Sequence, residues 1–264
     1  MIGSQIIHKD FCENSIKWCK ENFDSLKDGT VLMSNKYDYA IGRQGRIWQL
    51  YDGQLLITFI LKTNFTNAQN NSEINYKSDK QKNYSGKHLN HLNMSISLGI
   101  VDATKKYSVG LKWPNDFVIN NKKVGGMIIH TIWDLQSIKG LVVGIGINVN
   151  NIFKKEDNLH SLATSIKQEI DIKFINIDEL RDEILLKLNS RYNQYLQENY
   201  NNVFQNWKSS QVYLNKKILV HKKNGELISG IMQNVDSNGN LLLQDKFNKN
   251  HTLSFQSVEN ISAS

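Results

Sequence analysis

Four short runs of strand-forming residues follow one another between residues 109 and 150, and no other feature constrains the fold of this chain as tightly. They are rich in Val, Ile and Trp and are separated by turn-forming Asn, Asp and Gly. In order, they are VGLKW (109–113), FVIN (117–120), KVGGMIIHTIW (123–133) and GLVVGIGINVN (140–150). Four consecutive candidate strands imply a sheet at the centre of the protein.

Helical segments and one more strand accompany this sheet. The short apolar run 55–61, LLITFIL, predicts a buried strand. Apolar residues at helical spacing predict an amphipathic helix over 11–23 and a second helix over 88–107. A third helix is predicted over 177–197, because Asn176 begins a capping-box pattern ahead of it. We expect this third helix to pack against the sheet.

The character of the sequence changes after Trp207. Short alternating segments follow, and the Asn-Gly pair at 224–225 between two of them is a strong hairpin signal. We therefore predict a small antiparallel β domain over 212–264, joined to a larger α/β domain over 1–211. The polar stretch 63–87 lacks periodic apolar positions, which is typical of an extended insertion or mobile loop.

Composition excludes several classes of protein. A net charge of +7 suits acidic partners, but no Lys/Arg block is long enough for a nucleic-acid tail, so no nucleic-acid partner is expected. The chain shows no secretion signal and no apolar run of the ~20 residues that span a bilayer. We expect a cytoplasmic protein with no membrane partner. Cys12 and Cys19 would share one helix face as small core residues.

The only proline, Pro114, marks a candidate site. Proline favours extended backbone in the preceding residue, so Trp113 can end a strand and present Asn115 and Asp116 in a rigid turn. A return strand would carry Lys123 back beside that turn, followed by two glycines that permit close approach. The same pattern also fits a tight hairpin whose lysines are simply solvent-exposed.

Two glycine-containing stretches add candidate ligand contacts. In IGRQGRIW (41–48), Arg43 and Arg46 could place guanidinium groups on phosphate oxygens, although a solvated basic loop would have the same sequence. The spacing is not that of a P-loop. Glycines at 144 and 146 weaken their strand unless something packs on its backbone, and a β-bulge is the alternative.

Taken together, these blocks closely resemble the signature blocks of biotin protein ligases, in that family's order and approximate spacing. They are GRxGRxW at 42–48, KWPND at 112–116, Lys-x-x-Gly at 123–126 and GIGINVN at 144–150. The resemblance covers nearly the whole chain, because the segment after Trp207 is similar to the family's small SH3-like C-terminal domain.

The resemblance implies an α/β (α+β) fold with a mixed-sheet catalytic domain of the biotin/lipoate ligase type, which is class II synthetase-like. Because the similarity begins almost at residue 1, we expect the short form without an N-terminal DNA-binding domain. A monomer or a weak homodimer is expected.

The activity that the resemblance implies has two steps. The carboxylate of biotin attacks the α-phosphate of ATP, which is supplied with Mg²⁺, and gives biotinyl-5′-adenylate and pyrophosphate. A specific lysine of a biotin carboxyl carrier protein, an acidic carrier domain, then accepts the biotinyl group. A lipoate- or octanoate-transferring relative is one alternative, and a non-catalytic protein that binds biotinyl-adenylate or a carrier domain is another.

Roles for individual residues also follow from the resemblance. It implies Lys123, Arg43 and Asp116 as catalytic residues, with Lys123 on the biotin carboxylate and the α-phosphate. The implied biotin contacts are Asn14, Gly42, Arg43, Lys123, Gly125 and Gly126. The implied nucleotide contacts are Arg43, Arg46, Trp48, Asn115, Asp116 and Asn148; the metal ligands are left open.

The chain departs from the family pattern at several positions. Ile41 stands where the family has an arginine, and Tyr37 stands where it has a glutamine. Cys12 and Glu13 replace the Ser-Thr that precedes the retained Asn14. Such positions ordinarily touch the biotin ring or hold the arginine loop, so the departures bear on ligand identity and adenylate retention more than on the fold.

Overall fold

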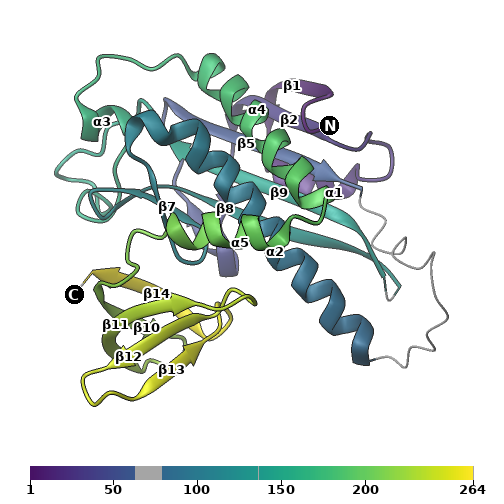
Figure 1. The fold of residues 1–264 in the computed structure, drawn as a ribbon. Coiled ribbons are helices and arrows are strands. Elements are labelled where there is room, and N and C mark those ends of the chain that lie inside the picture. The colour runs from purple at the N-terminus through teal and green to yellow at the C-terminus, as the bar shows by residue number, and fades with distance from the viewer. Residues whose placement is uncertain (63–78, 136, 264) are drawn as a thin grey trace.

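The computed structural model describes residues 1–62, 79–135 and 137–263, and it contains a large mixed sheet, a small antiparallel sheet and covering helices (Figure 1). β1 and β2 pair in parallel, whereas the other pairs of the large sheet are antiparallel. In spatial order the large sheet consists of β1 (Gln5–Cys12), β2 (Thr30–Tyr37), β5 (Gln54–Leu61), β9 (Ser137–Asn148), β8 (Lys122–Asp134), β7 (Asp116–Ile119) and β6 (Gly110–Lys112). The expected mixed sheet is thereby confirmed.

The four consecutive strands predicted between 109 and 150 correspond to β6, β7, β8 and β9. Asn120 and Asn121 form the turn between β7 and β8 and both have positive φ, which Asn tolerates better than most residues. The long β8 and β9 pair so that Gly126 lies directly opposite Gly146. This register places the Lys-x-x-Gly block beside the GIGINVN block in the middle of the sheet.

Helices cover both faces of the large sheet (Figure 1). On one face lie α2 (Asp79–Thr104), α4 (Ile177–Leu196) and α5 (Tyr200–Ser209), and α1 (Ser15–Glu21) packs on the other face against β2, β5 and β9. Shorter helical segments are η1 (Arg43–Gly45), η3 (Lys105–Tyr107) and α3 (Ile166–Ile170). The helix predicted over 177–197 is confirmed as α4, but the expectation that it packs against the sheet was wrong, because it packs mainly against α2.

Two helix predictions were wrong in their bounds. The helix predicted over 11–23 spans only 15–21, because the residues up to Cys12 extend β1 alongside β2. The second helix begins at Asp79 rather than 88, since a packed helix propagates through polar residues that carry no apolar periodicity. Of the predicted insertion over 63–87, residues 63–78 lie outside the described part of the chain.

The small sheet is a five-stranded antiparallel sheet and follows the hairpin pattern predicted after Trp207. Its turns include Gly225 and Gly239, both at positive φ, and Gly225 belongs to the Asn-Gly pair that predicted a hairpin. In spatial order its strands are β13 (Asn250–Leu253), β12 (Leu241–Asp245), β11 (Leu227–Val235), β10 (Lys217–Lys222) and β14 (Val258–Ala263). We call residues 217–263 the small β module.

One continuous hydrophobic cluster joins the large sheet, its helices and the small β module. Buried Trp113 and Trp207 belong to this cluster together with Met232 and Leu241 of the small β module. A division of the chain after residue 211 therefore stays a prediction. No helix in the described ranges is both long and apolar enough to cross a bilayer.

Candidate active site

The turn at Pro114 makes hydrogen bonds to β8 and to a turn of the small β module. Contrary to the expectation that this turn presents its side chains, Trp113 and Asn115 are buried. The Trp113 indole Nε1 donates to the Gly239 carbonyl at 2.8 Å, and the Asn115 amide donates to the Met127 carbonyl. Asp116, like Pro114, remains partly accessible, whereas neighbouring residues pack over the side chains of Trp113 and Asn115.

The hairpin between β7 and β8 brings a lysine and a carboxylate together, as predicted. The Lys123 amine lies 2.7 Å from the nearer Asp116 carboxylate oxygen. A register shift after Phe117 places Val118 opposite Lys123. The Lys123 backbone is fixed on its other side, where its N–H donates to Leu162 at 2.9 Å and its carbonyl accepts from Thr164 at 2.8 Å.

Glycines of β8 and β9 leave space beside Lys123 and Asp116. A Cβ at Gly126 would lie 3.2 Å from the Asp116 carboxylate and 3.5 Å from the Lys123 amine. A Cβ at Gly146 would lie 3.1 Å from the Trp48 ring, and one at Gly144 would clash with a side chain of α1. The prediction that something packs on this strand backbone is confirmed, and the pairing at 144 and 146 has no bulge.

The Trp48 ring lies over Gly146 and beside Lys123. It ends a small hairpin of β3 (Ala40–Ile41) and β4 (Ile47–Trp48), where a loop was predicted. The Lys123 amine lies 5.6 Å from the centre of the Trp48 ring, within the range of a cation–π contact. The buried indole N–H of Trp48 has no partner among the described residues, so it is a donor that a ligand could engage.

The two arginines of this hairpin reach toward the small β module. The Arg43 guanidinium donates to Asn115 Oδ1 and to the Phe255 carbonyl, both at 3.1 Å. The Arg46 guanidinium donates to the Glu259 carboxylate at 2.7 Å. Burial lowers the pKa of Arg43, while the nearby Asp116 carboxylate opposes that shift. Arg43 thus belongs to the same electrostatic cluster as Lys123 and Asp116.

Two other predicted ligand contacts use their amides within the protein. Asn14 caps α1 by accepting from the Lys17 N–H at 2.8 Å, and its amide donates to the Tyr39 carbonyl at 3.2 Å. Asn148 accepts from the Gln54 amide at 2.8 Å and donates to the Thr164 carbonyl at 3.0 Å. Both residues brace the hairpin and strands of the site, and their contacts with a ligand stay predictions.

Two of the positions that depart from the family pattern, Tyr37 and Cys12, present neutral groups, whereas the Glu13 carboxylate pairs with Lys17. Burial raises the pKa of Tyr37 to about 12, and its hydroxyl accepts from the Ser34 N–H at 2.9 Å. Burial also raises the pKa of Cys12. Cys12 and Cys19 are free thiols in a second hydrophobic cluster, on the α1 face of the sheet, which confirms them as core residues. The prediction that they share one helix face was wrong, because Cys12 is the last residue of β1.

Sequence reasoning missed one cation of this site. Lys112 of the KWPND block lies directly opposite Asp116 in the β6–β7 pair. Its amine donates to Asn260 Oδ1 at 2.9 Å. The position of Lys112 in the block was a usable signal, but no local pattern points to Glu259 or Asn260, which follow it by well over a hundred residues.

A cavity of about 390 Å³ adjoins the cluster. It lies between β8, the middle of α2 and the small β module, and its lining includes Arg43, Pro114 and Asn115 of the site. Apolar side chains of Met94, Ile128 and Trp207 line much of the rest, but Lys123 does not line it. Small-molecule sites typically combine apolar walls with a few placed polar groups.

The family model for the Biotin/lipoate A/B protein ligase family matches residues 13–148, which is just over half of the chain. The chain belongs to this family. The matched range contains the Pro114 turn, the arginine hairpin, Lys123 and Asn148, whereas the residues of the small β module that contact the site cations lie outside it.

Relatives of this family resemble the chain over most of its length. The bifunctional ligase/repressor BirA of Bacillus subtilis (strain 168) is 24% identical over 249 residues, which cover 92% of this chain and 70% of that protein. Biotin–protein ligase 2 of Arabidopsis thaliana is 20% identical over 254 residues, covering 91% and 69%.

Solved structures of the family share the fold. A biotin protein ligase of Aquifex aeolicus in complex with biotin and ATP superposes with a TM-score of 0.76 at 21% identity, covering 99% of this chain and 100% of that one. A Helicobacter pylori biotin acetyl coenzyme A carboxylase synthetase gives a TM-score of 0.55 at 18% identity, covering 94% and 99%. The expected catalytic fold with a small β region is thus confirmed.

Proposed function

We propose that this chain is an ATP-dependent biotin protein ligase. It activates biotin as biotinyl-5′-AMP and transfers the biotinyl group to a specific lysine of a biotin carboxyl carrier protein. The observation that carries this proposal is the Lys123 amine, held between the Asp116 carboxylate and the Trp48 ring with Arg43 nearby. The similarity to a biotin–protein ligase of Arabidopsis thaliana and to a biotin protein ligase of Aquifex aeolicus in complex with biotin and ATP supports biotin as the substrate.

The first step joins two anions. A carboxylate oxygen of biotin attacks the α-phosphorus of ATP, the bond to the β-phosphate oxygen breaks, and pyrophosphate leaves. Like charges ~4 Å apart repel by about 4 kcal/mol at an effective dielectric constant of 20, so cations are required. Lys123 contacts the carboxylate and the α-phosphate in this proposal, and Arg43 stabilises the charge that develops on the phosphate.

The nucleotide enters as its magnesium complex. Mg²⁺ prefers phosphate and carboxylate oxygens and keeps several waters. The described residues contain no group of three His, Cys, Asp or Glu side chains that could hold a metal, and Asp116 is the one carboxylate beside Lys123. Asp116 and Asn115 would therefore help place a metal that arrives on ATP, while Trp48, Arg46 and Asn148 contact the nucleotide.

The second step releases AMP. The neutral amine of the carrier lysine attacks the acyl carbon of biotinyl-5′-AMP, the bond to the phosphate oxygen breaks, and the amine loses a proton. Arg43 and Arg46 would shield the mixed anhydride from water beforehand. Gly125, Gly126, Gly42 and Asn14 line the biotin pocket in this proposal. The acidic carrier domain, the monomeric or weakly dimeric state, and domains of 1–211 and 212–264 belong to the same proposal.

Pyrophosphate release from ATP tests the proposal directly. We expect release that depends on biotin and not on lipoate or octanoate, followed by biotin transfer to a carrier domain. Lipoate- or octanoate-dependent release would assign the chain to the lipoate branch of the family. Tight binding of biotinyl-5′-AMP without any release would make the chain a binding protein.

A further inference from the structure

A six-residue stretch of the small β module, residues 255–260, accepts hydrogen bonds from three cations of the site. The Phe255 carbonyl accepts from Arg43 at 3.1 Å, and the Glu259 carboxylate accepts from Arg46 at 2.7 Å. The Asn260 side-chain oxygen accepts from the Lys112 amine at 2.9 Å. The cations come from different elements of the large sheet and its hairpin, so this stretch fixes where their charges lie relative to one another.

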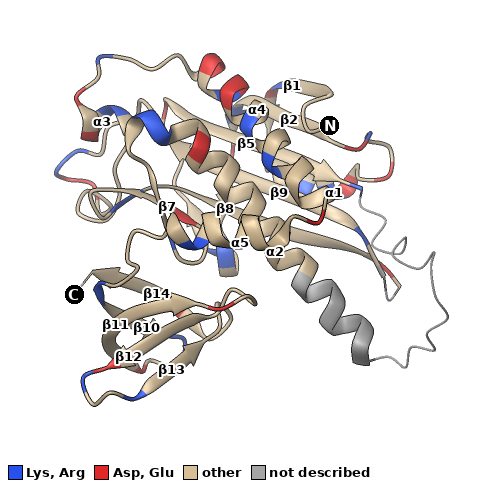
Figure 2. Cartoon of the chain, viewed as in Figure 1, with Lys and Arg blue, Asp and Glu red and all other residues tan. Residues whose placement is uncertain are grey.

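Lys112 faces the reacting groups. Residues directly opposite in an antiparallel pair point to the same side of the sheet, and Lys112 lies opposite Asp116. Burial lowers the pKa of Lys112, Asp116 opposes that shift and Lys123 adds to it. These couplings place the Lys112 amine within electrostatic reach of both partners of the central ion pair. Figure 2 shows blue Lys and Arg segments and a red acidic segment near β7.

The site carries more positive than negative charge. Its cations are Lys112, Lys123, Arg43 and Arg46, and its carboxylates in the described part of the chain are Asp116 and Glu259. Asp116 is paired with Lys123 and Glu259 with Arg46, so Lys112 is held by a neutral amide. Asp116 offsets the charge of Lys112 only in part, because it is already paired with Lys123, so an arriving anion would stabilise the partly buried ammonium group.

We propose that Lys112 binds a phosphate group of the nucleotide, and that Asn260 of the small β module is the positioning residue that orients the Lys112 amine for this contact. This inference rests on the proposed function and assigns a further part of the same site. A neutral acceptor suits this task, because it orients the ammonium group without offsetting the charge that the phosphate needs.

The alternative is a purely structural role, in which the hydrogen bond only docks the small β module. Asn260→Asp separates the two roles. An aspartate keeps an oxygen in place and binds an ammonium more strongly than an amide does. It would therefore preserve a structural contact, but it would offset the charge of Lys112 and weaken ATP binding.

A matched control is available in Asn90. Its amide donates to the Asn238 carbonyl of the small β module at 2.7 Å, and neither partner of this bond is charged. Asn90→Ala and Asn260→Ala thus each remove an asparagine hydrogen bond between the small β module and the rest of the chain. Only the second of these bonds ends on a cation of the site.

The experiment measures KM for ATP and for biotin, kcat and thermal unfolding in the full-length variants. We expect KM for ATP to rise about fivefold in Asn260→Ala and tenfold or more in Asn260→Asp. The KM for biotin and the unfolding temperature of Asn260→Asp should stay near the wild-type values. Adding Asn260→Ala to Lys112→Gln should raise KM for ATP no further, because Asn260 acts through Lys112.

Two results would overturn this inference. One is an Asn260→Asp variant with the wild-type KM for ATP, and the other is an Asn260→Ala variant that behaves like Asn90→Ala. Failure of the proposed function looks different, since the wild-type protein itself would then release no pyrophosphate with biotin.

Discussion

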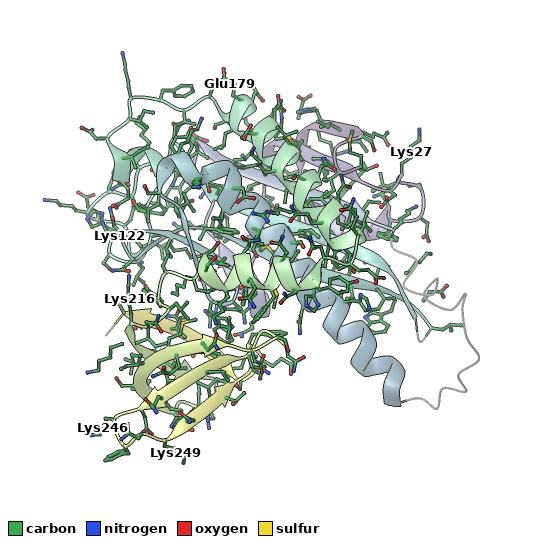
Figure 3. The ribbon with its side chains drawn as sticks, in the orientation of Figure 1. Lys27, Lys122, Glu179, Lys216, Lys246 and Lys249 are labelled. Atoms are coloured by element: carbon green, nitrogen blue, oxygen red, sulfur yellow. The ribbon has the colours of Figure 1, made fainter. Side chains whose placement is uncertain are left out.

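Lys123 and Lys122 are adjacent in sequence but have different partners. The Lys123 amine contacts Asp116 and Trp48, whereas the Lys122 amine lies 3.3 Å from the Glu169 carboxylate. Figure 3 shows Lys122 at the same margin of the molecule as Lys216. Substituting each lysine in turn therefore distinguishes the effect of losing the Lys123 amine from the effect of losing any positive charge at this turn.

We predict that Lys123→Ala lowers kcat for biotin-dependent pyrophosphate release by about 10²–10³-fold, the typical effect of removing one donor to a developing oxyanion. Lys122→Ala should retain most of the activity, since partly exposed ion pairs contribute ~1 kcal/mol or less to stability. Steady-state kinetics on both variants makes the comparison. Equal losses in the two variants would contradict the assignment of Lys123 as the catalytic amine.

The buried thiol of Cys19 links stability to pH. Burial raises the pKa of Cys19 from 9.0 to about 12, so the folded protein keeps the thiol neutral at pH values where the unfolded chain ionises it. Its contribution to the free energy of unfolding is complete below pH 9.0 and declines as the pH rises toward about 12. Urea unfolding between these limits should show a smaller decline in Cys19→Ala than in the wild-type protein.

At the scale of elements, α4 and α5 differ in their N-caps. Asn176 accepts from the Asp178 and Glu179 N–H groups, whereas Asn199 at the start of α5 makes no side-chain cap. Figure 3 shows Glu179 at the outer end of α4. We predict that Asn176→Ala lowers the free energy of unfolding by about 1 kcal/mol. Asn199→Ala should change it much less, and equal changes would show that the cap adds nothing.

The packing of α2 on α4 depends on Gly99. A Cβ at this position would lie 2.9 Å from the Leu188 Cα, a backbone atom that cannot move independently of α4. Gly99→Ala should therefore lower the free energy of unfolding by about 1–3 kcal/mol despite the better helix propensity of alanine. Ser95→Ala on the same helix is the control, because the buried Ser95 hydroxyl has no partner among the described residues. Its stability should be equal to or above that of the wild type.

Elements formed by local pairing were predictable from the sequence. The β7–β8 hairpin brings Lys123 to Asp116 through a turn of two asparagines, and a separation of seven residues is within reach of pattern reasoning. The register shift after Phe117 and the extension of β1 to Cys12 depend on neighbouring strands, which no single segment encodes. Burial of Asn115 likewise follows from its packing partners, not from its polarity.

At the scale of the whole molecule, the site is assembled from residues far apart in the chain. Arg43 contacts Asn115 in the large sheet and Phe255 in the small β module, across separations of 72 and 212 residues. Contacts of this kind arise only once the two sheets dock. The signature blocks therefore predicted the chemistry of the site but not which groups hold its cations in place. The small β module is consequently part of the site.

The net charge of +7 bears on how a carrier protein would approach. Lysines lie even at the distal turn of the small β module, where Figure 3 labels Lys246 and Lys249. Positive charge speeds the encounter with an acidic partner, and added salt suppresses this effect. Raising the ionic strength from about 0.01 M to 1 M shortens the Debye length from about 30 Å to about 3 Å.

We therefore predict that kcat/KM for an acidic carrier domain falls steeply with ionic strength, by tenfold or more across that range. The control is kcat for pyrophosphate release at saturating ATP and biotin without carrier, because saturation removes the encounter step from the rate. It should depend only weakly on salt. A carrier kcat/KM as insensitive to salt as this control would mean that the basic surface of the protein does not steer its protein substrate, and that recognition relies on short-range contacts alone.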